Sequence, residues 1–159
     1  MIVELIGAGI VLLSAMFVSA GMIRDYKNDL RLLGALYDMI LYIRDNIEHF
    51  MKPLPDIFQN YSNEHLETCG FLKSVRETDL QQAWTERPWQ LNREADSVML
   101  DFVQTIGSGY RAEELRLCEY TLERLRGILE KSRTESAGKI KLYRTVPVLF
   151  ALSVILILI

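Results

Sequence analysis

Two histidines and two cysteines are the side chains in this sequence best suited to metal binding or nucleophilic chemistry. His65 and Cys69 are spaced i, i+4, which would place an imidazole and a thiol on the same face of a helix. Two ligands do not make a metal site, because structural zinc is held by four. His49 has no ligand-spaced partner, and neither histidine lies in an HExxH pattern. We therefore expect no metal and no cofactor.

Phosphate binding and acid–base catalysis are not indicated either. The GSG turn at residues 107–109 has no lysine after it and no strand before it, unlike a phosphate-binding loop. The neighbouring acids Glu113 and Glu114, and the pair Asp96 and Asp101, are typical of solvated carboxylates rather than of a general acid and base. The sequence therefore predicts a protein that is not an enzyme and takes no small-molecule substrate.

The elements that would position any site lie between two long apolar runs. Neither run contains a charged side chain. Residues 5–23 (LIGAGIVLLSAMFVSAGMI) would span roughly 28 Å as a helix, close to the roughly 30 Å hydrocarbon core of a bilayer. Residues 145–159 would span roughly 22 Å and could be lengthened by the snorkelling side chains of Lys139, Lys141 and Arg144. We predict a transmembrane helix in 1–23 and another in 145–159.

Each apolar run has an alternative interpretation. The first could be a cleaved signal peptide, because VSA before Gly21 resembles a cleavage site, although no lysine or arginine precedes the run and Glu4 does. The second could be a buried core helix, although its VILILI segment favours insertion into a membrane.

Charged residues predict the orientation in the membrane. All eighteen lysines and arginines lie between positions 24 and 144, and both apolar runs are flanked by cations only on that side. Because cationic flanks stay in the cytoplasm, we expect residues 24–144 to be cytoplasmic and both termini to lie outside. The net charge of −3 does not favour nucleic-acid binding. Two cysteines, Cys69 and Cys118, suit a reducing compartment, with a disulfide as the alternative.

The middle of the chain is predicted to be all-α, an antiparallel helical bundle flanked by the N- and C-terminal transmembrane helices. Steps of three and four residues favour one amphipathic helix over 29–51 and another over 111–135. No strand-like alternation is sustained. The first stripe is Leu30, Leu33, Tyr37, Ile40, Ile43, Ile47 and Phe50, and the second is Leu115, Cys118, Leu122, Leu125 and Leu129.

Shorter helices are indicated between these two. Pro53 should end the first helix at Lys52, with a short helix resuming after Pro55. Gly70 is typical of a helix C-terminus, and Thr78 or Asp79 of an N-cap. A further helix is expected over 93–106, followed by the turn at 107–109. Trp84 and Trp89 are interpreted as core residues rather than as an exposed clamp for a partner.

Two patterns are candidates for contact with partners. Gly7, Ser14 and Gly21 recur every seven residues, and small side chains on one face let two helices approach closely in lipid. The alternative is chance, since small residues are common in membrane spans. The second pattern is a set of cations on the last bundle helix, which could equally be a solvated face or could meet anionic lipids. This candidate partner surface consists of Arg116, Arg124, Arg126, Lys131 and Arg133.

Several stretches resemble a known family. RLLGALYDMILYIRDNIEHFMKPLPDIF over 31–58 resembles a long helix followed by a Pro-Leu turn in stage III sporulation protein AB. The Ala83-Trp84 pair, LDFVQTIGSG over 100–109 and the basic KIKLYR before the last apolar run match the same family in order.

The resemblance implies a component of the sporulation channel complex in the mother-cell membrane surrounding the forespore. It also implies similarity to the platform proteins of type II secretion and type IV pilus machines. The implied partners are the sporulation ATPase of the same complex, other membrane proteins of the channel and the lipid bilayer. The alternatives from other classes are a two-span pore-forming or lysis-type protein, which would need polar faces in its spans, and a membrane-bound enzyme.

Overall fold

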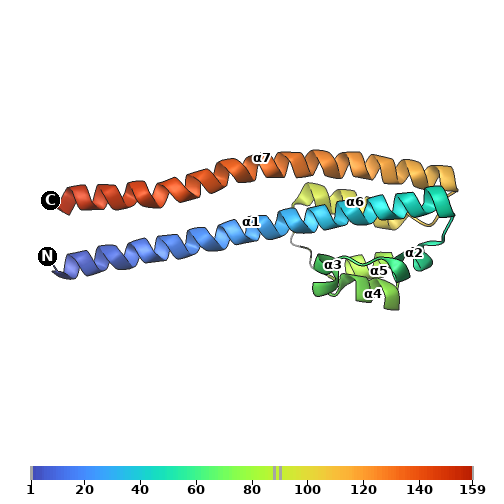
Figure 1. Ribbon diagram of the computed structural model, residues 1–159, viewed down its shortest axis with the longest axis horizontal. Helices are drawn as coiled ribbons and strands as arrows, with labels where there is room; N and C mark the ends of the chain where they lie inside the picture. The colour runs from blue at the N-terminus through green and yellow to red at the C-terminus, as the bar shows by residue number, and fades with distance from the viewer. Residues whose placement is uncertain (1, 88, 90, 159) are drawn as a thin grey trace. The chain divides into compact units, whose positions relative to one another are not determined.

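A computed structural model describes residues 2–87, 89 and 91–158 of the chain, and over these residues all regular secondary structure is helical (Figure 1). The predicted all-α class is therefore confirmed. The helices are α1 (Ile2–Phe50), α2 (Leu54–Asn60), α3 (Glu64–Thr68), α4 (Phe71–Glu77), α5 (Leu80–Thr85), α6 (Arg93–Thr105) and α7 (Arg111–Leu158).

The chain divides into two compact units. One consists of Met1–Asn28 and Ser132–Ile159, and the other, which we call the central unit, is Asp29–Lys131. Helices α1 and α7 each contribute residues to both units, whereas α2 to α6 belong to the central unit alone. The central unit has the hydrophobic core, so the fold is described there.

Helix α1 supplies one wall of that core. Leu33, Ile40, Ile43 and Ile47 are buried as the three–four spacing predicts. The same spacing predicts a buried Phe50, but its side chain is 66% exposed, so this part of the prediction is wrong. The physical reason is that Phe50 is the last residue of α1 and the chain leaves the helix at the next residue.

The turn from α1 to α2 differs from the expected one. The helix ends at Phe50, ahead of Lys52, because Met51 has a φ of 50° and so lies in the left-handed region. Pro53 is extended and precedes Leu54, and Pro55 occupies the first turn of α2, where its missing N–H costs nothing. The short helix predicted after Pro55 is thus confirmed, with a start at Leu54.

Side-chain and glycine caps delimit the next helices. The Asn63 side chain accepts hydrogen bonds from the backbone N–H groups of His65 and Leu66 at the start of α3. Gly70, with φ of 77°, ends that helix as predicted. Of the two residues predicted as an N-cap for α5, the structure uses Asp79, whose carboxylate accepts from the Gln82 N–H at 2.7 Å.

Helices α6 and α7 complete the bundle. Asn92 caps α6, which carries the fully buried Phe102. Cys118, Leu122 and Leu125 form the buried stripe of α7. In the central unit α7 runs antiparallel to α1, and the Arg111 guanidinium donates to the Glu48 carbonyl, which ties the start of α7 to the end of α1 (Figure 1).

The two predicted spans, 5–23 and 145–159, fall within the helical ranges of α1 and α7, but most of their side chains lie outside the described residues. Among the residues that the structure describes, no helix is both long and apolar enough to cross a membrane. The division into 1–23, 24–144 and 145–159 therefore stays a prediction.

The turn between α6 and α7 supplies a first test of the fold. Gly107 has φ of 85°, and a β-carbon added there would lie 2.9 Å from Leu54 Cδ1. We expect Gly107→Ala to lower the free energy of unfolding by roughly 1–3 kcal/mol, measured by urea unfolding of the full-length chain in detergent. Gly127→Ala is the matched control, because that glycine is helical, exposed and has nothing within 4 Å of an added β-carbon. It should instead stabilise by roughly 0.5–1 kcal/mol. Equal effects at both positions would contradict this account of the turn.

Candidate interaction surface

The basic residues predicted as a partner surface lie on α7, and all five are exposed. Arg124 and Arg126 are two residues apart, a separation that puts side chains on different sides of a helix. Lys131 lies seven residues after Arg124, close to two turns, and so shares its side, whereas Arg116 falls between the sides of Arg124 and Arg126. Within the central unit the cations are therefore spread around α7 rather than gathered on one face. Gly21 and the fifth cation, Arg133, belong to the other unit.

The cations differ in the contacts that they make within the chain. The Arg124 guanidinium lies 3.8 Å from the Glu94 carboxylate on α6 and 5.9 Å from the centroid of the Tyr120 ring. Arg126 pairs with Glu130 at 3.3 Å, one turn along α7. No ion pair with a residue that the structure describes is formed by Arg116, Lys131 or Arg133. Their charges are therefore more available to a partner than those of Arg124 and Arg126.

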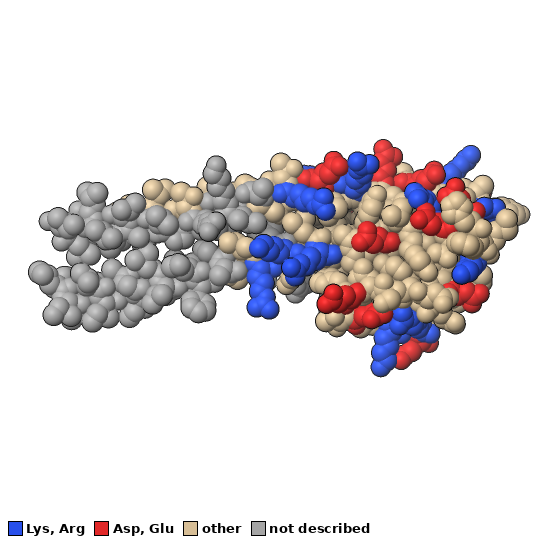
Figure 2. Space-filling model, in the orientation of Figure 1, with Lys and Arg blue, Asp and Glu red and all other residues tan. Residues whose placement is uncertain are grey.

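Acidic and basic side chains are mixed over the face of the central unit seen in Figure 2. The exposed pairs noted above contribute under about 1 kcal/mol each, because water screens them. These ion pairs therefore add little to the stability of the fold.

The two cysteines lie in different surroundings. Cys118 is fully buried in the stripe of α7, and burial raises the pKa of its thiol to about 12, which leaves it protonated at neutral pH. The half-buried Cys69 thiol donates to the Leu66 carbonyl at 3.3 Å. Both cysteines are free. Within the described part of the chain, no three His, Cys, Asp or Glu side chains gather as metal ligands.

The two tryptophans pack in or against the hydrophobic core, as interpreted from the sequence. Trp84 is 3% exposed and Trp89 is half-buried. Their rings are stacked with centroids 4.4 Å apart, and the Trp89 indole N–H donates to the Trp84 carbonyl at 3.0 Å. The edge of the Phe71 ring contacts this stack. The pair is therefore engaged internally rather than open as a clamp.

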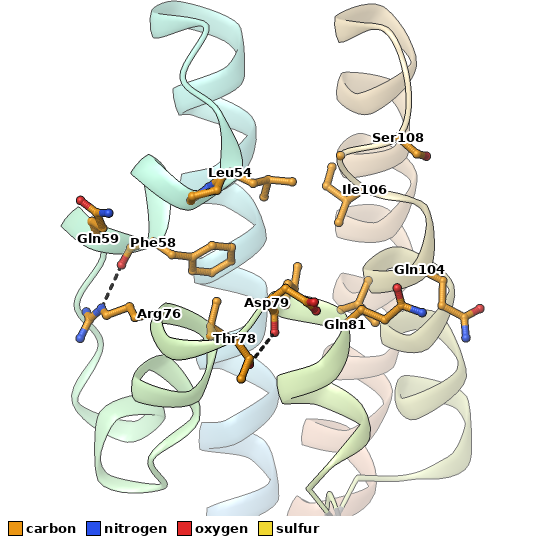
Figure 3. Close-up of a pocket in the computed structure, with 15 residues that line it drawn as sticks. Leu54, Phe58, Gln59, Arg76, Thr78, Asp79, Gln81, Gln104, Ile106 and Ser108 are labelled. Atoms are coloured by element: carbon orange, nitrogen blue, oxygen red, sulfur yellow. Dashed lines mark hydrogen bonds between the residues drawn. The ribbon is translucent and has the colours of Figure 1, made fainter.

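A pocket that the sequence does not reveal lies between α2, α4, α5 and α6 (Figure 3). It has a volume of about 380 Å³ and a buried apolar floor that includes Phe58 and Ile106. The polar groups at its rim are mostly neutral amides and hydroxyls. Two charged side chains also lie there, and both form hydrogen bonds within the chain. Arg76 donates to the carbonyls of Phe58 and Tyr61, and the Asp79 carboxylate caps α5. No local pattern marks this site, since four helices have to pack before it exists.

The structure describes only part of the helix-packing face that is predicted in the first apolar run. The side chains around Gly7 and Ser14 lie outside the described residues. Gly21 is exposed, and an added β-carbon would meet nothing within 4 Å. This leaves room for a second helix at Gly21, and the predicted packing stays a prediction.

The described residues thus define an all-α protein whose central unit is a helical bundle with a hydrophobic core. The chain belongs to the stage III sporulation protein AB family, whose family model matches residues 4–159. This confirms the resemblance seen in the sequence and makes the chain a protein of that stage of sporulation. The family is not a known enzyme family. Neither the curated proteins nor the solved structures include a match to the chain.

Proposed function

We propose that this protein is a non-enzymatic platform subunit of a sporulation channel complex, which links a cytoplasmic ATPase to the membrane. The observation that carries the proposal is the extent of the family match. It runs from residue 4 to residue 159 and so includes both apolar runs as well as the bundle. The proposal places the chain in the mother-cell membrane around the forespore.

The apolar runs and their flanks support a membrane role. Residues 5–23 are long enough as a helix for a bilayer, and residues 145–159 become so if the basic side chains before them snorkel. Two spans with cationic residues only on the bundle side favour a cytoplasmic bundle. The small side chains at Gly7, Ser14 and Gly21 would then pack against other channel proteins.

The connection between the bundle and the ends of the chain supports a role in transmitting motion. Helices α1 and α7, rather than loops, contribute residues to both compact units. A bundle attached through two helices would transmit a nucleotide-driven movement of a bound ATPase to the membrane at two points. A single flexible anchor would transmit it poorly.

The exposed basic residues of α7 are the proposed contact with the ATPase. We expect Arg116→Glu to weaken binding of the sporulation ATPase to the full-length chain, because a cation without an internal ion pair becomes a repulsive charge. The dissociation constant should rise by roughly tenfold, and raising the salt to about 0.5 M should weaken wild-type binding as well. Biolayer interferometry with the chain in nanodiscs measures both.

Two matched variants make this test specific. Arg93→Glu changes an exposed arginine at the start of α6 and should leave the dissociation constant unchanged. Arg124→Glu would also bring two carboxylates together, because its present partner is Glu94, so its unfolding must be measured alongside binding. Wild-type affinity in Arg116→Glu would rule out this part of α7 as the contact.

A further inference from the structure

The two apolar runs are bordered by short segments of the same character. RDYK at 24–27 directly follows the first run, and KLYR at 141–144 directly precedes the second. Each segment has one cation next to its run and another three residues further from it, with a tyrosine between the two. We call Arg24, Lys27, Lys141 and Arg144 the basic collar.

The distance of the collar from the apolar runs corresponds to one layer of lipid headgroups. Residues 24–27 belong to α1 and residues 141–144 to α7, and both segments are part of the same compact unit. At a rise of 1.5 Å per residue, the collar cations lie roughly 1.5–6 Å along the helix from the ends of their runs. A headgroup layer is about 5–8 Å thick on each side of the hydrocarbon core. In the membrane arrangement proposed above, the collar therefore lies at the level of the headgroups.

The collar cations whose side chains the structure describes are available to an external anion. Arg24 and Lys27 are exposed, and a spacing of three residues puts them on one face of α1. Neither forms an ion pair with a residue that the structure describes. The side chains of Lys141 and Arg144 lie outside the described residues.

The charge of the collar is opposite to that of the central unit. Its two segments hold four cations and one acid, Asp25, which gives a net charge of +3. The central unit, Asp29–Lys131, holds twelve cations and eighteen acids, which gives −6. An anionic partner would therefore be attracted to the collar and repelled by the central unit as a whole. The tyrosine in each segment favours a lipid as that partner, because tyrosine is enriched where helices cross the headgroup layer.

We propose that the basic collar binds the phosphate groups of anionic phospholipids in preference to zwitterionic ones. The guanidinium and ammonium groups would donate hydrogen bonds to the phosphodiester oxygens, and the acyl chains would lie against the adjoining apolar runs. A zwitterionic lipid has the same phosphate but also a cation, which the collar repels. The inference rests on the membrane role proposed above and adds a lipid specificity to it.

Native mass spectrometry of the full-length chain, released from nanodiscs with equal amounts of phosphatidylglycerol and phosphatidylcholine, measures this preference. We expect the chain to retain at least about tenfold more phosphatidylglycerol, and about 0.5 M salt in the nanodisc buffer to reduce the excess. Arg24→Gln combined with Lys27→Gln should lower the preference by about fivefold or more, because each cation near an anionic surface contributes roughly fivefold. Tm should not change, since both side chains are exposed and unpaired.

Two further double variants make the test specific to charge at the collar. Arg24→Lys combined with Lys27→Arg keeps both charges and should keep the preference. Lys73→Gln combined with Arg93→Gln removes two exposed cations from the central unit and should also keep it.

Incorporation into nanodiscs separates this inference from the proposed function, because insertion depends on the apolar runs. A wild-type chain that enters nanodiscs but retains the two lipids equally would overturn the lipid preference alone. The same conclusion would follow from an unchanged preference after loss of both charges at Arg24 and Lys27, or from release of the retained lipid by excess soluble glycerol phosphate. A wild-type chain that does not enter nanodiscs would contradict the membrane role and this inference together.

Discussion

Phe102→Ala is expected to lower the free energy of unfolding by about 3–5 kcal/mol. Phe102 is fully buried on α6 and is among the largest side chains without exposed surface. Removing its ring leaves a cavity that the neighbouring helices can close only in part. Because a domain of this size is stable by only about 5–15 kcal/mol, the change would remove a large share of its stability.

Tryptophan fluorescence during urea unfolding of the full-length chain in nanodiscs would measure this change, since Trp84 and Trp89 both lie in the central unit. Leu100→Ala is the control, because Leu100 is on the same helix but 37% exposed, and it should cost less than about 1 kcal/mol. A loss below about 1 kcal/mol for Phe102→Ala would contradict the packing of α6 described above.

The second large effect concerns membrane topology. A cysteine added at either terminus should react with a membrane-impermeant maleimide in intact cells, whereas one in the bundle should react only after permeabilisation. Tyr120→Cys is a suitable bundle reporter because Tyr120 is 58% exposed. The contrast should be nearly all-or-none, since a bilayer separates the two groups of sites.

Native cysteines affect how this labelling is interpreted. Cys118 is buried with a pKa of about 12, so it should stay unlabelled on either side of a membrane. The half-buried Cys69 should be replaced by serine in every variant tested, to leave one reactive thiol. Labelling of Tyr120→Cys before permeabilisation would contradict a cytoplasmic bundle.

Local signals predicted much of the fold. Gly70 and Asp79 were recognisable because helix caps depend on a residue's own conformational and hydrogen-bonding preferences. The stripes of α1 and α7 followed from helical spacing, and Leu33, Ile43 and Leu125 are buried accordingly. These features need no knowledge of the tertiary structure.

Features that depend on where helices end were harder to predict from the sequence. Phe50 continues the apolar spacing of α1, yet it is exposed because the positive φ of Met51 turns the chain away at that point. The pocket beside Phe58 and Ile106 was likewise invisible, since its walls come from helices that meet only in the folded unit. By contrast, the two-residue spacing of Arg124 and Arg126 is enough to predict that they lie on different sides of α7.

The most direct measurement of the proposed function is binding of the sporulation ATPase to the full-length chain in nanodiscs, with and without nucleotide. The platform role predicts that nanodiscs containing the chain retain the ATPase, that retention differs between the two nucleotide states, and that the chain alone hydrolyses no ATP. Empty nanodiscs are the control. Absence of retention in both states, or ATP hydrolysis by the chain alone, would contradict the proposed function.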